Sequence, residues 1–201
     1  KKITTILNWA PIRFEKKIKT NFLQLNKLDN KKILLFSGTL GKKHSTEILF
    51  NISKNLSDDY FLVVITNPEI VDKLNSDAKS QHLSQISFYP FQPAEDIPYI
   101  FKSAYLLINI LNDDSNFSVP SKVLSYIVAA RPIFLVMPED NEISQMVIKN
   151  ELGVVADFKN TESFFDSLQD LLLDNELRNT YIKNCERYSE NNFSSQDKIR
   201  A

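Results

Sequence analysis

Short, almost uninterrupted apolar runs alternate along this chain with segments whose apolar residues recur every three or four positions. The runs predict buried β-strands at 33–36, 60–66, 86–89, 105–111, 133–137 and 154–156. The periodic segments predict amphipathic helices over 47–56, 70–78, 97–104, 120–130, 143–152, 164–171 and 177–188. Strands that are apolar on both faces and joined by helices form right-handed βαβ units. We therefore predict an α/β fold, a Rossmann-like parallel sheet of about six strands with helices on both faces.

The predicted domain occupies residues 33–190. Residues 1–32 have no clean period and predict a lead-in made of an extended connector and a loop, and the polar residues 191–201 predict a C-terminal tail. Gly153 follows a helical segment, so we predict that it ends this helix as a C′ glycine.

The start of one predicted helix has the chemistry of an anion-binding site. Pro120 suits the first helical position, and this would leave the amides of Ser121, Lys122 and Val123 free to point out of the helix end. Such an end carries partial positive charge and suits a phosphate, and Ser121 and Lys122 add a hydroxyl and a full charge. The alternative is an ordinary capped helix with a solvated lysine.

A second loop at the same predicted edge of the sheet also offers donors. Ligands of parallel sheets bind beyond the carboxyl ends of the strands, where loop 37–46 carries Gly38, Gly41, Lys42 and Lys43. The glycine spacing matches neither a Walker loop nor the dinucleotide fingerprint. We expect one phosphate-bearing ligand to lie across this loop and the start of the helix at Pro120.

Composition excludes several other classes of function. The net charge is −1 and no stretch is persistently basic, which argues against a nucleic-acid groove. One cysteine, Cys185, and two histidines, far apart in sequence, make a zinc site improbable. Asp113 and Asp114 form an acidic loop that we interpret as solvated. No apolar run approaches the roughly 20 residues of a membrane span.

Several motifs occur together in an order typical of one enzyme family. They are Ile33 to His44 (ILLFSGTLGKKH), Phe88 to Pro93 (FYPFQP), Pro120 to Ile133 (PSKVLSYIVAARPI), Asn150 to Val155 (NELGVV) and Leu171 to Arg178 (LLLDNELR). In this order the chain resembles the C-terminal half of a family 4 glycosyltransferase of the GT-B fold, over most of residues 33–190. Residues 3–14 resemble the connector between the two GT-B domains. The resemblance implies a domain that binds a nucleotide-diphosphate sugar, with acceptor binding mostly on a separate N-terminal domain.

The resemblance also implies roles for individual residues. Lys122 and Lys43 would stabilise the leaving diphosphate and are the catalytic candidates. The donor-binding candidates are Gly38, Thr39 and Lys42 beside the diphosphate, Phe91 and Gln92 at the nucleobase, and Ser118, Ser121 and Val123 at the helix end.

The chain departs from the family pattern at several positions. Two glutamates separated by seven residues are replaced by Phe117 and Ser125, an arginine expected near Thr39 is missing, and Ala130 stands where a glycine is usual. A glycine-rich turn after the second strand is replaced by Asn67-Pro68. These losses favour an alternative, a degenerate homologue that acts as a non-catalytic interaction subunit. An unrelated Rossmann-like mononucleotide module is a third reading.

The resemblance therefore implies transfer of a sugar from a UDP- or GDP-linked donor to a glycan or glycoconjugate, in surface polysaccharide synthesis. We expect no metal, no cofactor beyond the donor and no nucleic-acid partner. We expect a cytoplasmic protein at the inner face of the membrane, with any membrane association through the full-length protein. The isolated 201-residue chain should fold but should not turn over, because half of the cleft would be missing.

Overall fold

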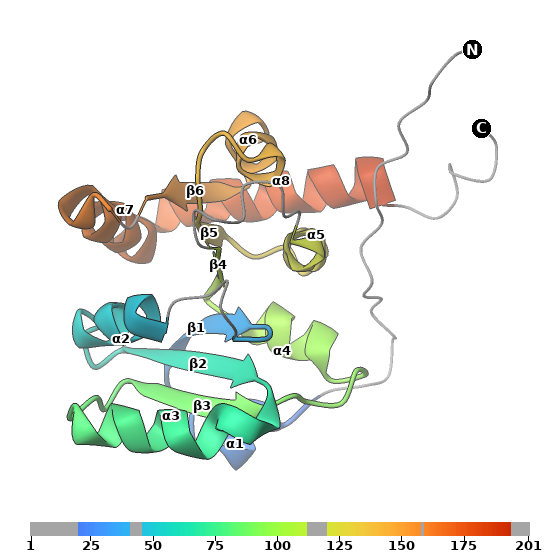
Figure 1. Cartoon of the computed structure of the whole chain (residues 1–201). Helices are drawn as coiled ribbons and strands as arrows, with labels where there is room; N and C mark the ends of the chain where they lie inside the picture. Colours follow the sequence, from blue (N-terminus) through green and yellow to red (C-terminus); the bar gives the residue numbers. More distant parts are fainter. Residues whose placement is uncertain (1–19, 41–45, 112–119, 158, 194–201) are drawn as a thin grey trace, which may run out of the picture.

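The computed structural model describes residues 20–40, 46–111, 120–157 and 159–193, and these form one α/β domain (Figure 1). A single sheet of six parallel strands has the order β3-β2-β1-β4-β5-β6. The strands are β1 (Lys32–Ser37), β2 (Tyr60–Thr66), β3 (Ile86–Pro90), β4 (Leu106–Ile110), β5 (Ile133–Val136) and β6 (Gly153–Ala156). All five strand pairings are parallel, as the alternation of apolar runs and helices predicts.

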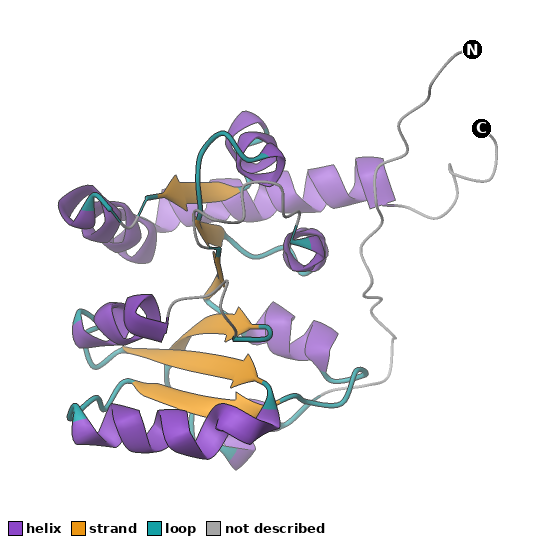
Figure 2. Cartoon of the chain, in the orientation of Figure 1, coloured by secondary structure: helices purple, strands orange, loops and turns teal. Residues whose placement is uncertain are grey.

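Helices cover both faces of the sheet, which explains why the strands are apolar on both faces (Figure 2). They are α1 (Phe22–Leu25), α2 (Thr46–Lys54), α3 (Pro68–Ser80), α4 (Ile97–Ser103), α5 (Ser121–Val128), α6 (Glu142–Lys149), α7 (Thr161–Leu173) and α8 (Asn175–Phe193). One core joins the sheet to α2, α3 and α7, and the other joins it to α1, α4, α5 and α6. Helix α8 contacts both cores: Leu177 and Tyr181 pack against the first, whereas Cys185 and Tyr188 pack against the second.

Two local predictions were wrong. The lead-in contains the short helix α1, and Phe22 and Leu28 are buried in the second core. The left-handed residue after α6 is Glu151, with φ 50°, and not Gly153, which is the first residue of β6. A Cβ on Gly153 would lie 2.0 Å from the carbonyl oxygen of Ile133. The glycine therefore permits the close approach of β5 and β6 and does not end a helix.

The strand order locates the ligand edge. Strand β1 lies between β2 and β4. The chain adds β2 and β3 on one side of β1, and it then adds β4, β5 and β6 on the other side. This reversal is the topological switch point, and ligands of such sheets bind in the crevice outside the carboxyl ends of the strands there. The relevant segments are the turn after β1 and the start of α5, the helix that follows β4.

None of the described helices is long and apolar enough to cross a membrane. Within the same described segments, no three His, Cys, Asp or Glu side chains cluster in a way that could hold a metal ion.

Candidate functional site

The turn after β1 is held in place by the end of β2. The amide of Gly38 donates to the carbonyl of Ile65 at 2.9 Å, which continues the sheet pairing by one residue. The amide of Leu40 donates to Thr66 Oγ1 at 3.1 Å and to Asn67 Oδ1 at 3.3 Å. The Thr66 hydroxyl donates to the same Asn67 oxygen at 2.9 Å. Asn67 therefore shapes the turn that contains Gly38 and Thr39, although in sequence it looked only like the loss of a glycine.

Tyr126 attaches α5 to the last residue of β1 and to the middle of β4. Its side chain is fully buried, and its ring lies edge-on to Phe101 at a centroid distance of 5.0 Å. Its hydroxyl accepts a hydrogen bond from the Ser37 amide at 3.3 Å and donates to the Ile108 carbonyl at 3.3 Å. Burial raises the pKa of the Tyr126 phenol well above its ordinary value, so it remains a neutral donor. One helical turn earlier on the same face stands Lys122.

Lys122 extends across the switch point to the turn after β1. A Cβ built on Gly38 would lie 3.2 Å from Lys122 Nζ, so the ammonium group occupies the space that a side chain at position 38 would need. Lys122 is partly buried, and burial lowers the pKa of its amine. In the described part of the chain its Nζ has no hydrogen-bond acceptor and no carboxylate partner. A partly desolvated, unpaired cation at a helix N-terminus is unfavourable unless an anion joins it.

The helix end differs in two details from the sequence prediction. Pro120 is the N-cap and not the first helical residue, and it provides no side-chain acceptor. The amide of Val123 donates to the Pro120 carbonyl at 3.0 Å, so Val123 is not a free donor, and its side chain lies in the core. Ser121 and Lys122 are the first two helical residues, whose amides have no partner within the helix.

The remaining sequence-predicted residues divide into two groups. Thr39 is exposed in the turn beside Gly38. Phe91 is 49% exposed and follows β3 at the same edge of the sheet, while Gln92 Nε2 donates to the Pro90 carbonyl at 2.8 Å. Since β3 lies two strands from β1, these residues are about 10 Å along the edge from Gly38. Three candidates, Lys42, Lys43 and Ser118, lie outside the described residues.

Sequence reasoning missed Tyr126, Thr66 and Asn67. Tyr126 had one visible signal, its position four residues after Lys122 on an otherwise aliphatic helical face. Its hydrogen-bond partner Ser37 is 89 residues away in sequence, so only the strand order reveals the contact.

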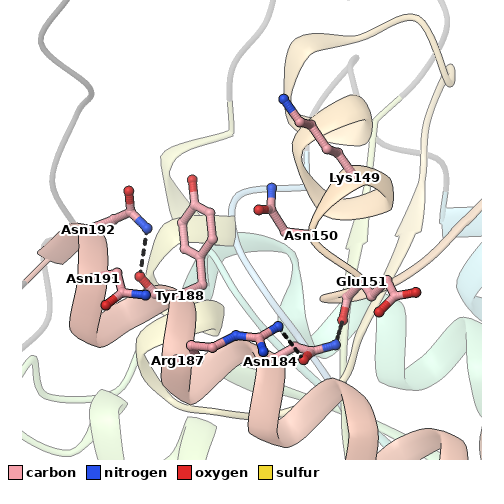
Figure 3. A pocket seen from close by; sticks show the side chains of 8 residues that line it. All are labelled: Lys149, Asn150, Glu151, Asn184, Arg187, Tyr188, Asn191 and Asn192. Carbon is pink, nitrogen blue, oxygen red and sulfur yellow. Dashed lines mark hydrogen bonds between the residues drawn. The ribbon is translucent and has the colours of Figure 1, made fainter.

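A polar pocket of about 310 Å³ lies elsewhere, between the end of α6 and the last turns of α8 (Figure 3). Three hydrogen bonds join residues that line it. Arg187 donates to Asn184, Asn184 to the Glu151 carbonyl and Asn192 to the Tyr188 carbonyl. None of the sequence-predicted site residues that the structure describes lines this pocket.

The strand order defines a Rossmann-like domain, and Gly38 and Lys122 lie together at the switch point of its sheet. Residues 17–188 match the family described as glycosyl transferases group 1, and the chain belongs to this family.

The chain spans about half the length of the relatives described below. Spore coat protein SA of Bacillus subtilis (strain 168) is 24% identical over 180 residues, which cover 84% of this chain and 47% of that protein. Among solved structures, Anabaena HepE in complex with UDP-glucose superposes with a TM-score of 0.71 and 12% identity, over 86% of this chain and 47% of HepE. The α,α-trehalose 6-phosphate synthase of Burkholderia multivorans superposes with a TM-score of 0.63 and 13% identity, over 86% and 41% of the two chains. The predicted Rossmann-like half of a GT-B fold is thereby confirmed.

Proposed function

We propose that this domain binds the donor of a glycosyltransferase reaction and holds the diphosphate of a nucleotide sugar between the turn after β1 and the start of α5. The observation that carries the proposal is the position of Lys122 Nζ against Gly38, without a counter-ion in the described residues. Membership of the glycosyl transferase family gives the anion its chemical class.

The site would act on charge that develops during transfer. When the bond between the sugar anomeric carbon and the diphosphate oxygen breaks, the bonding electron pair leaves with the diphosphate. Lys122 and the free amides of Ser121 and Lys122 would stabilise this growing negative charge, because they are fixed before the reaction begins. The acceptor hydroxyl would form the new bond to the anomeric carbon and release its proton to a base outside this domain.

The nucleobase would lie toward β3. Phe91 offers an exposed aromatic face, and Gln92 adds an amide close to it. Their distance of about 10 Å from Gly38 suits a nucleoside whose phosphates lie at the switch point. UDP is the ligand we would test first, because similar structures are described as complexes with UDP-glucose and, for S. aureus MnaA, with UDP.

The acceptor and the biological role belong to the whole protein. The chain spans 47% of the curated relative it matches. We propose that the acceptor site lies on an N-terminal domain, and that the full-length enzyme transfers sugar to a glycan or glycoconjugate of the cell surface from the cytoplasmic side of the membrane. The isolated domain should bind donor and show no transfer.

Isothermal titration calorimetry with UDP, GDP, UDP-glucose and uridine tests this proposal. We expect binding that requires the diphosphate and is strongly reduced in Lys122→Ala. Lys149→Ala removes a lysine from the last turn of α6, away from the switch point, and is the matched control. Equal binding of uridine and UDP, or UDP binding that survives in Lys122→Ala, would contradict the assignment.

One observation favours the second candidate function, a non-catalytic homologue acting as an interaction subunit. Ser125 stands where the family resemblance expects a glutamate, and it is only 2% exposed inside α5. It therefore contributes no acid to position a sugar. Absence of any nucleotide binding, by a chain whose unfolding remains cooperative, would select this candidate.

A further inference from the structure

A strongly cationic pocket of about 330 Å³ lies at the other edge of the sheet, where the strands begin. Its walls come from the starts of β1, β4 and β5 and from the first half of α8. Among the described residues, four cationic side chains line it and no acidic side chain does. These cations are Lys31, Lys32, Arg131 and Arg178.

Two of the cations are positioned by aromatic rings. Lys32 Nζ lies 5.0 Å from the ring centroid of Tyr60 and 5.4 Å from that of Tyr105. The guanidinium of Arg178 lies 3.8 Å from the Tyr105 centroid, and it donates to the Tyr105 hydroxyl and to Asn175 Oδ1. These contacts orient the charges without neutralising them.

The other two cations are anchored by carbonyl groups. Lys31 Nζ donates to the Asp58 carbonyl, while Arg131 donates through Nε to the Lys102 carbonyl at 2.7 Å and through Nη1 to the Ala130 carbonyl at 3.2 Å. Nη2 of Arg131 has no partner among the described residues. Burial lowers the pKa of Arg131, and the carboxylate of Glu186 partly opposes this effect. None of the four cations forms a salt bridge within the described segments.

We propose that this pocket binds a small phosphate-bearing anion, separately from the nucleotide-sugar site. Two guanidinium forks and two ammonium groups supply donors only, and a guanidinium matches phosphate oxygens in a bidentate arrangement. The volume suits a small ligand such as a phosphomonoester or a diphosphate. Strand β1 separates the two edges by roughly 17 Å, so one diphosphate cannot serve both sites.

Inorganic pyrophosphate is the probe that we would titrate, with binding followed by amide chemical shifts and by calorimetry. We expect shifts at Ala104 and Tyr105, and at least tenfold weaker binding in the double variant Lys31→Gln/Arg131→Gln. The matched control, Lys149→Gln/Arg187→Gln, removes the same charge from the pocket of Figure 3. We expect its affinity for pyrophosphate to change by less than twofold. If pyrophosphate binding weakened equally in both double variants, the loss would reflect net charge alone, and the proposal would be overturned.

Two further variants keep the test decisive. Lys31→Gln/Lys32→Gln changes only exposed side chains, so it remains informative if loss of Arg131 impairs folding. In Lys122→Ala the shifts at Ala104 and Tyr105 should persist while those at Gly38 and Thr39 disappear. If the shifts at Ala104 and Tyr105 disappear together with those at Gly38 and Thr39, the cationic pocket is not an independent site.

A second arm identifies the source of the phosphate. We would measure co-sedimentation with phosphatidylcholine vesicles that contain phosphatidic acid. Sedimentation that is lost in Lys31→Gln/Arg131→Gln assigns the pocket to a lipid headgroup, and pyrophosphate binding without sedimentation assigns it to a soluble phosphate. Absence of both refutes the proposal.

Discussion

Replacing Lys122 by methionine should raise the stability of the free domain and weaken its binding of diphosphate. The methionine keeps the length and packing of the lysine stem but removes the ammonium group. In the free domain this charge is partly buried, unpaired within the described residues, and placed at the end of α5 where the helix dipole repels cations. The dipole term alone amounts to about 0.3–1 kcal/mol, so the free energy of unfolding should rise by roughly that amount.

The effect on binding has the opposite sign and is larger. A hydrogen bond to a charged group contributes about 1.5–3 kcal/mol, which corresponds to an increase of about 10- to 150-fold in the Kd for UDP. Urea denaturation measures the first quantity and calorimetry the second. Lys149→Met is the control: Lys149 lies in the last turn of α6, where a cation is favourable. That variant should lose a few tenths of a kcal/mol and bind UDP unchanged.

The pH dependence checks the same reasoning. Burial lowers the pKa of Lys122 in the folded state below its ordinary value of 10.5. Between these two pKa values the unfolded chain binds more protons than the folded chain, so stability rises with pH in that window. The advantage of Lys122→Met should therefore be complete below the folded pKa and shrink as the pH approaches 10.5. A destabilised Lys122→Met, or one with unchanged UDP affinity, would refute an anion site built on this lysine.

Three other substitutions test particular backbone positions. Gly38→Ala places a methyl group 3.2 Å from Lys122 Nζ; the ammonium group can move, so the fold should survive while calorimetry shows roughly tenfold weaker UDP binding. Gly153→Ala places its methyl 2.0 Å from the Ile133 carbonyl oxygen, which belongs to the backbone; urea denaturation should show a loss of about 3 kcal/mol or more. Ala130 has φ 52°, a conformation that costs about 1–2 kcal/mol for a residue with Cβ. Glycine removes this cost but gains about 0.4–1 kcal/mol of conformational entropy in the unfolded chain. Ala130→Gly should therefore stabilise the domain by roughly 0.5 kcal/mol. A destabilised Ala130→Gly, or a Gly153→Ala domain of unchanged stability, would contradict these assignments.

The sheet was predictable because helices bury both of its faces, which makes each strand a continuous apolar run regardless of its partners. Helix α1 was not, because four residues cannot display a helical period. The reason for Gly153 was hidden as well, since it depends on the approach of Ile133 from another strand.

The candidate site shows the same limit. Gly38 and Lys122 both follow strands of a parallel sheet, and the carboxyl ends of such strands lie at one edge. The sequence alone therefore predicted that these residues share an edge. Their contact depends on β1 being the neighbour of β4, which no local pattern encodes. The hydrogen bonds of the Tyr126 hydroxyl to β1 and β4 could not be predicted either. An aromatic residue on an apolar helical face looks like an ordinary core residue until the partners of its hydroxyl are known.

The start of α5 provides a last test, because its N-cap has been left without an acceptor. Asn141 and Asn160 accept amide hydrogen bonds at the starts of α6 and α7, whereas Pro120 offers no side chain that could do so for α5. Its backbone is extended, with φ −72° and ψ 98°, which suits a capping residue. Pro120→Asp should therefore cap the helix and stabilise the free domain by about 1 kcal/mol. The same carboxylate would compete with a phosphate for the free amides and repel it, so UDP binding should weaken. Pro120→Ala, which adds no acceptor, separates the cap from the loss of proline. If Pro120→Asp were stabilised and bound UDP as tightly as the parent, the diphosphate could not lie at this helix end.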